Sequence, residues 1–155
     1  LRRPMTDYTV ISRELTLPAS ADAISAWIVD FHKWVSWSPW EDIDPNLQRT
    51  YSGPPSGVGT AYEWSGNRKA GAGKMTITSV APEEIKLDLD FTKPFKSASK
   101  TTFTLAAGAD GTTVVWQVFT PKSLMTRIFG IFMNFDKMVG ADLERGLAKL
   151  KSVVA

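Results

Sequence analysis

The hydrophobic positions near the C-terminus repeat with the period of an α-helix. From about Ser123 to Val154 they recur at steps of three and four, which keeps one face of a helix apolar. This stripe consists of Ile128, Ile131, Phe132, Phe135, Met138, Val139, Leu143, Leu147, Leu150 and Val153. A helix of this length would span roughly 45 Å at about 1.5 Å per residue. It cannot bury such a stripe alone, so the pattern predicts that the rest of the chain wraps it.

The N-terminal part of the chain is predicted to form one strand and two short helices. Tyr8 to Leu17 alternates loosely between apolar and polar residues, as a strand does. Ser20 is a good N-cap for a helix that begins near Ala21. A second short helix is expected from Phe31 to Val35. It ends before Trp37-Ser38-Pro39-Trp40, because the residue before a proline avoids the helical conformation.

The middle of the chain, from Asn46 to Phe119, reads as a series of antiparallel strands. The cleanest alternation runs from Ile85 to Phe91, with apolar residues expected to face inward and charged residues to face water. Gly66-Asn67 and Asp110-Gly111 are strong turn signals. The predicted order is one strand, two short helices, about six strands and one long helix. This order favours a single α+β domain in which a curved antiparallel sheet of about seven strands grips the C-terminal helix.

Composition narrows the function without identifying it. The chain has 155 residues, a net charge of +2, no cysteine and a single histidine, His32. Disulfides, cysteine-based metal sites and multi-histidine zinc sites are therefore excluded, and the scattered charge gives no sign of nucleic-acid binding. We expect no metal and no cofactor. The six tryptophans and eight phenylalanines indicate either an apolar cavity or an unusually aromatic core.

Several short motifs resemble a known family. They are Trp37-Ser-Pro-Trp40, Asp44-Pro45, Tyr51-Ser-Gly53, Gly57-Val-Gly59, Tyr62-x-Trp64-x-Gly66-Asn67, Gly71-x-Gly73-x-Met75-Thr-Ile77, Lys93-Pro94-Phe95, Phe135-Asp-Lys-Met-Val-Gly140 and Leu143-Glu144-x-Gly146-Leu147. Together they resemble the bacterial polyketide cyclase/dehydrase branch of the START-like (SRPBCC) superfamily. The resemblance implies a helix-grip fold with an apolar cavity between the sheet and the long helix. Members bind lipids, sterols, polyketides or other apolar molecules, and only some of them are enzymes.

The same resemblance suggests how the domain is placed in the cell. Many similar sequences carry a single N-terminal membrane helix before an Arg-Pro pair like Arg3-Pro4. Residues 1–7 would then be a tail that follows a membrane anchor absent from this sequence, and residues 8–155 a single START-like ligand-binding domain. Arg2 and Arg3 would lie at the membrane surface, where basic residues favour anionic headgroups. A bacterial domain without an anchor, in the cytoplasm, is the open alternative, and the sequence does not predict the oligomeric state.

The predicted ligand-binding residues are aromatic and apolar side chains of the sheet, of the tryptophan loop (Trp37 to Trp40) and of the long helix, together with one carboxylate of that helix. They are Trp37, Trp40, Tyr62, Trp64, Met75, Phe91, Phe103, Trp116, Phe129, Phe132, Met133 and Asp136. As a cavity lining they would offer broad apolar contact to a small molecule. The alternative interpretation is that these side chains fill the core and leave no space. Trp37 and Trp40, which flank Pro39, form either a lid over the cavity or an apolar surface patch.

Three residues are weak candidates for acid–base chemistry. Asp136 lies at the edge of the apolar stripe, where a half-buried carboxylate would bind a ligand hydroxyl or move a proton, unless it pairs with Arg68, Lys74 or a strand backbone. Tyr62 and His32 are the other two, and a solvent-facing or capping histidine is the simpler interpretation of His32. Glu41 and Asp42 could form an acidic pair near the cavity mouth, although loop carboxylates are usually solvated.

Three functions remain open at this point. The leading hypothesis is a binding domain for an apolar or amphipathic small molecule such as a lipid, sterol or polyketide. The second is an enzyme of the cyclase/dehydratase type that uses Asp136, Tyr62 or His32 as acid or base. The third is a structural or protein-interaction module whose core is filled.

Overall fold

A computed structural model of the chain describes residues 8–41, 43–68, 70–93, 96–122 and 135–154, with side-chain environments from Lys137 onward in the last of these segments. Its elements are β1 (Tyr8–Leu17), α1 (Ala21–Ile28), the 3₁₀ helix η2 (Phe31–Ser36), β2 (Gln48–Ser52), β3 (Ala61–Ser65), β4 (Ala72–Ala81), β5 (Glu84–Lys93), β6 (Ser97–Gly108), β7 (Gly111–Pro121) and α3 (Phe135–Val154).

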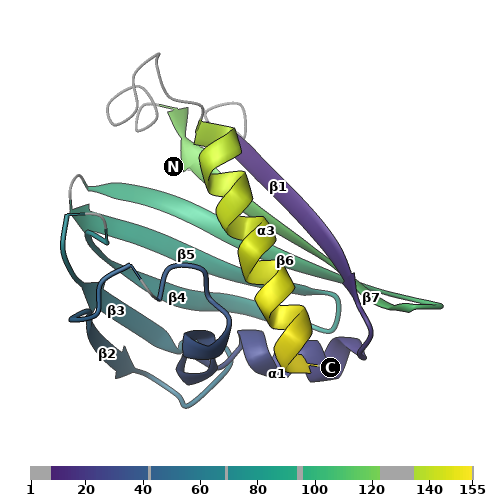
Figure 1. Cartoon of the computed structure of the whole chain (residues 1–155). Coiled ribbons are helices and arrows are strands. Elements are labelled where there is room, and N and C mark those ends of the chain that lie inside the picture. Colours follow the sequence, from purple (N-terminus) through teal and green to yellow (C-terminus); the bar gives the residue numbers. More distant parts are fainter. Residues whose placement is uncertain (1–7, 42, 69, 94–95, 123–134, 155) are drawn as a thin grey trace.

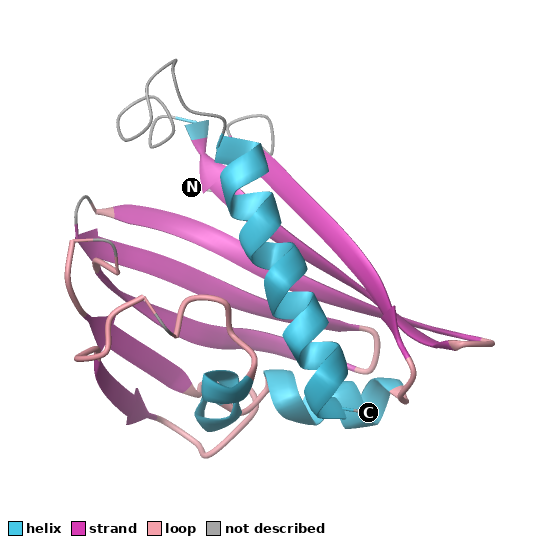
Figure 2. Ribbon diagram, viewed as in Figure 1, coloured by secondary structure: helices cyan, strands magenta, loops and turns pink. Residues whose placement is uncertain are grey.

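The strands form one antiparallel sheet in the order β1-β7-β6-β5-β4-β3-β2. The first strand therefore pairs with the last one, from Tyr8 opposite Pro121 to Leu17 opposite Thr112. The sheet is curved, and α3 runs across one of its faces with α1 at the C-terminal end of the helix (Figure 1). Figure 2 shows the helices gathered on that side of the strands. The predicted α+β helix-grip fold with seven strands is confirmed.

The two short helices begin where polar side chains cap them. Ser20 accepts a hydrogen bond from the backbone N–H of Ala23 at 3.1 Å, which starts α1 as the sequence predicts. Asp30 accepts one from the backbone N–H of His32 at 3.0 Å and starts η2. The indole of Trp34 donates to the carbonyl of Ile28 at 2.8 Å. This bond ties the second helix to the end of the first.

The predicted turn at Asp110-Gly111 is also confirmed. Gly108 pairs with Gly111 across a two-residue loop that joins β6 and β7. Gly111 has a φ of +127°, which glycine adopts without strain, and a Cβ there would collide with the backbone of Leu17. The turn thus fixes the register of the two longest strands and lies against the end of β1, which pairs with β7.

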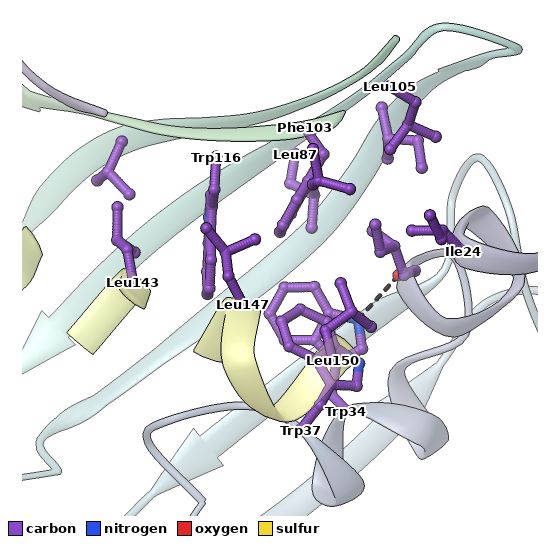
Figure 3. Close-up of a cluster of buried hydrophobic side chains, with 14 of the residues drawn as sticks. Ile24, Trp34, Trp37, Leu87, Phe103, Leu105, Trp116, Leu143, Leu147 and Leu150 are labelled. Atoms are coloured by element: carbon purple, nitrogen blue, oxygen red, sulfur yellow. Dashed lines mark hydrogen bonds between the residues drawn. The ribbon is translucent and has the colours of Figure 1, made fainter. Parts of the chain in front are cut away.

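The core lies between the C-terminal part of α3 and the inner face of the sheet, by which we mean the face that α3 covers. Leu143, Leu147 and Leu150 of α3 point toward a group of aromatic rings from η2, the following loop, β6 and β7 (Figure 3). These rings are Trp34, Trp37, Phe103 and Trp116. All four are at most 1% exposed, and their centroids lie 4.5–6.5 Å apart in tilted, edge-on or stacked pairs.

One position of the predicted helical stripe is wrong. Met138 is 41% exposed, because it precedes Leu143 by five positions and so lies about 140° around a helix of 3.6 residues per turn. The predicted residues 123–134 of the long helix lie outside the described part of the chain. Among the described residues, no helix combines the length and the apolar character needed to cross a membrane.

Candidate functional site

A group of half-buried apolar side chains lies on the inner face of the sheet, beside the filled core. Met75 is directly opposite Tyr62 on one side and Leu89 on the other, and directly paired residues of an antiparallel sheet share a face. Since Tyr62 belongs to the buried core, this row also faces inward. Ser99, opposite Leu89, continues this row, and the next row along the strands holds Trp64, Phe91 and Ser97. We call the set the shelf: Trp64, Met75, Leu89, Phe91, Ser97 and Ser99.

The shelf is less covered than the core. Its four apolar side chains are partly exposed, whereas the core rings next to them are buried. The ends of β3, β4 and β5 extend away from α3 on the left of Figure 1. The shelf belongs to these strand ends, because Trp64 is the penultimate residue of β3 and Phe91 is near the end of β5.

Gly73 allows the two shelf aromatics to meet. It lies between Trp64 and Phe91 in the register, and a Cβ on it would be 2.6 Å from the Trp64 ring and 2.5 Å from the carbonyl oxygen of Asp90. The Trp64 ring therefore lies over the glycine and meets Phe91 edge-on, with centroids 5.6 Å apart at 90°. A hydrogen bond of 2.9 Å from its indole to the carbonyl of Ala70 holds the ring in place.

Two hydroxyl groups complete the shelf. Ser97 is opposite Phe91, and Ser99 is opposite Leu89. Both Oγ atoms are buried, and neither has a hydrogen-bond partner in the described part of the chain. A buried hydroxyl without a partner costs about 1–3 kcal/mol. The shelf therefore combines apolar surface with unused hydrogen-bonding capacity.

A charged cluster borders the shelf at β2 and β3. Glu41 has a side chain only 6% exposed, and Arg49 binds its Oε2 through Nη2 at 2.7 Å and Nε at 2.8 Å. The phenol of Tyr62 donates to its Oε1 at 3.2 Å. This hydrogen-bonded carboxylate raises the pKa of Arg49. Burial, followed by the charge of Glu41, raises the pKa of Tyr62 far above that of a free tyrosine. The cluster at neutral pH is a closed ion pair beside a protonated phenol.

The cluster continues outward as a stack of rings. Tyr51 stacks on Tyr62 with centroids 5.3 Å apart and on His32 at 3.9 Å. His32 has a side chain 61% exposed and pairs with Asp30 at 3.2 Å. Burial raises the pKa of Tyr51 as well. His32 therefore lies at the solvent end of the stack, on the far side of Tyr51 from Tyr62.

The predicted site residues fall into three groups. Trp64, Met75 and Phe91 are on the shelf. Trp37, Tyr62, Phe103 and Trp116 are buried and packed against other side chains. Trp40 is half-buried, donates to Asp142 of α3 at 3.1 Å and meets Trp116 edge-on at 5.6 Å, so it joins the tryptophan loop to the helix.

The remaining predicted residues lie wholly or partly outside the described part of the chain. Phe129, Phe132, Met133 and Asp42 lie outside the described residues. Asp136 belongs to α3, but its side chain is outside the described part.

Four residues of the site were not predicted from the sequence: Arg49, Leu89, Ser97 and Ser99. The expectation that Glu41 is solvated is wrong, because the fold brings Arg49 and Tyr62 to it. The pairing with Arg49 left no pattern in the sequence. Ser97 and Ser99 were detectable in principle, since they share strand parity with the inward-facing Phe103.

Comparison with known proteins agrees with this architecture. The sequence profile of a family described as "Polyketide cyclase / dehydrase and lipid transport" matches residues 8–155. A comparison with curated protein sequences gives no significant match.

Solved structures with the same fold are distant in sequence. Protein MLL2253 from Mesorhizobium loti is 15% identical with a TM-score of 0.67, covering 94% of this chain and 96% of its own. The Aha1 dimer from Colwellia psychrerythraea gives 15% identity and a TM-score of 0.66, with coverage of 94% and 96%. The di-domain ARO/CYC protein StfQ from the steffimycin biosynthetic pathway is 11% identical with a TM-score of 0.68. The match covers 94% of this chain and 50% of StfQ. At these identities the likeness establishes the fold alone.

Proposed function

The chain belongs to the polyketide cyclase / dehydrase and lipid transport family, and from this premise we propose that it binds an apolar or amphipathic small molecule against the shelf. The guest would be of the lipid, sterol or polyketide type. It would lie on the shelf, against the strand ends of β3–β6. Residues 8–155 would act as a single ligand-binding domain.

The observation that carries this proposal is the incomplete burial of the shelf. Trp64, Met75 and Phe91 are inward-facing on a sheet whose neighbouring core is closed, yet they keep accessible apolar surface. Covering apolar surface yields about 25 cal/mol per Å². A guest that covers these side chains therefore gains affinity without any change in the core.

Binding is favoured over acid–base catalysis by the state of Tyr62. Its hydroxyl proton is already donated to Glu41, and its raised pKa keeps the phenol from acting as a base at neutral pH. His32 is exposed at the solvent end of the ring stack. These pairings describe a rigid wall beside the shelf, which suits a binding site.

The proposal is tested with the neutral fluorescent dye Nile red. We expect saturable binding to the wild-type protein and a loss of affinity of about 5- to 20-fold in Phe91→Ser, since a large part of an apolar side chain's burial energy is removed. Phe119→Ser is the matched control. Phe119 is also half-buried but lies next to the inward-facing Val118 of β7 and so on the opposite face. Equal losses in both variants, or no dye binding to the folded wild-type protein, would contradict the proposal.

A further inference from the structure

We propose that the hydroxyls of Ser97 and Ser99 recognise oxygen groups on the buried part of the guest, so that the site selects oxygenated ring molecules over fatty acyl chains. This inference rests on the proposed binding function and defines its ligand class. It depends on three observations: the position of the two hydroxyls, their lack of hydrogen-bond partners among the described residues, and the position of the nearby charged side chains.

The two hydroxyls are placed for contact with the same guest. They are two residues apart on β6, and so on the same face of the sheet and about 7 Å apart along the strand. Their cross-strand neighbours are Phe91 and Leu89, both members of the shelf. A molecule that covers the apolar shelf would therefore lie next to both serines, and it would contact their hydroxyls once the side chains that cover them move aside. Two oxygen atoms on one fused ring system can match such a spacing.

The hydroxyls are buried but unused. Ser99 is only 2% exposed, and neither Oγ atom has a hydrogen-bond partner among the described residues. Buried hydroxyls in proteins nearly always have one. A hydroxyl can both donate and accept, so it matches a neutral carbonyl or hydroxyl oxygen. A hydrocarbon chain would leave the serines unsatisfied.

Among the described residues, no cation near the shelf is placed to bind an acidic group at the two serines. Arg49 lies opposite Trp64 and shares its face, but its guanidinium is bound to Glu41. Lys93 and Lys96 are exposed near the ends of β5 and β6. An ionised group on the guest would therefore be placed outside, near these lysines. The buried end of the guest would carry neutral oxygen.

The experiment compares 1,5-dihydroxynaphthalene, naphthalene and oleate by isothermal titration calorimetry. The wild-type protein is expected to bind the diol at least 5-fold more tightly than naphthalene. In Ser97→Ala/Ser99→Ala the affinity for the diol should fall by about 5- to 30-fold, the range for two lost hydrogen bonds. The affinities for naphthalene and oleate should change by less than 2-fold. Ser65→Ala, a change of the same type at an exposed position of β3, is the matched control.

The variants should fold, because the change removes a buried hydroxyl that has no partner. Thermal unfolding checks this, and the single variants Ser97→Ala and Ser99→Ala, each expected to lose about 2- to 6-fold in diol affinity, replace the double variant if it does not fold. Diol binding that is unchanged in the variants overturns the inference and leaves the binding function intact, since it means that the serines make no hydrogen bond to the guest. If neither the probes nor Nile red binds the wild-type protein, both proposals fail.

Discussion

Glu41 is a buried carboxylate that two residues of other elements satisfy together. Arg49 of β2 neutralises it, and Tyr62 of β3 donates the second hydrogen bond. An ion pair removed from water owes its stability to complete pairing, and loss of one partner leaves a charge without compensation. The cluster thus anchors the tryptophan loop to the edge of the sheet and forms the wall beside the shelf.

Glu41 and Arg49 should therefore be strongly coupled in their contribution to stability. Arg49→Met should destabilise the protein by about 1–3 kcal/mol, less than the 3–5 kcal/mol of a fully buried pair because Arg49 is partly exposed. Glu41→Gln/Arg49→Met should cost less than the sum of the two single changes. Urea unfolding of the four proteins gives the coupling energy as a double-mutant cycle.

The matched control is the surface pair Lys100–Asp88. Its atoms are 3.0 Å apart, but both side chains are more exposed than those of Glu41 and Arg49. The same cycle there should give at most about 0.5 kcal/mol, as exposed ion pairs do. A Glu41–Arg49 coupling as small as that of the surface pair would show that the cluster does not stabilise the loop.

The inward-facing aromatic residues are easier to predict from the sequence than the pairing of charged side chains. Alternation along a strand predicts that Tyr62, Trp64 and Phe91 face inward, since the period of two depends only on neighbours in the sequence. The same alternation does not distinguish a filled position from a half-covered one. The pairing of Glu41 with Arg49 depends on how the loop folds back onto β2, which no local pattern encodes.

Two glycines of α3, Gly140 and Gly146, lie against different kinds of neighbouring residues. A Cβ on Gly140 would collide with the guanidinium of Arg13, which is the flexible end of a long side chain. A Cβ on Gly146 would lie 2.7 Å from the ring of Trp116 and 3.0 Å from Pro39. Neither of these can move easily in the packed core. Gly146 thus sets how closely the helix approaches the sheet.

We expect the same substitution to have different effects at the two positions. Alanine is about 1 kcal/mol more favourable than glycine inside a helix. In Gly140→Ala this gain offsets the displacement of Arg13 and the loss of its exposed pair with Glu144, so stability should change by less than about 0.5 kcal/mol. In Gly146→Ala overpacking against Trp116 outweighs the gain, and the protein should lose about 1–2 kcal/mol.

Chemical denaturation of the two alanine variants measures this difference directly. The slope of the unfolding free energy with denaturant should stay the same, because neither change alters the surface exposed on unfolding. Equal stability of the two variants would mean that α3 can shift away from Trp116 without cost.

The elements themselves were largely predictable because their signals are local. The N-cap at Ser20 and the turn at Asp110-Gly111 each depend on a few adjacent residues, and both are confirmed. The sequence also predicts the second short helix, but it does not predict the 3₁₀ form of that helix. In the structure this helix is capped by Asp30 and held by the hydrogen bond from Trp34 to Ile28. The wrong placement of Met138 arose because a stripe drawn with mixed steps of three and four drifts around the helix.

At the scale of the whole molecule, the inner face of the sheet has two regions with different packing. Toward β1, β7 and α3 it is closed by the aromatic core. Toward β2, β3 and the ends of β4 and β5 it presents the half-buried shelf, and β2 is a short edge strand with mostly exposed residues. Local opening costs least free energy where few buried contacts are lost. The fold therefore combines a rigid region with a more easily opened region where the guest is proposed to bind.

This division predicts a gradient in native-state hydrogen exchange. Backbone amides of β6 and β7, which are flanked by strands on both sides, should exchange only through global unfolding. Amides of β2 and β3 should exchange through local openings that cost at least about 2 kcal/mol less, since local opening energies range from near zero to the global value.

Saturation with Nile red should then slow exchange in β3, β4 and β5, because a ligand that binds only the closed state stabilises it by mass action. Amides of β1, paired with β7 at the far edge of the sheet, serve as the internal control where they exchange through local openings that leave the shelf intact, and their exchange should not change. Equal protection of both edges in the free protein would contradict the division into two regions. Slowing that is equal in β1 and β3 would place the guest elsewhere, because a guest on the shelf contacts only the strands that form it.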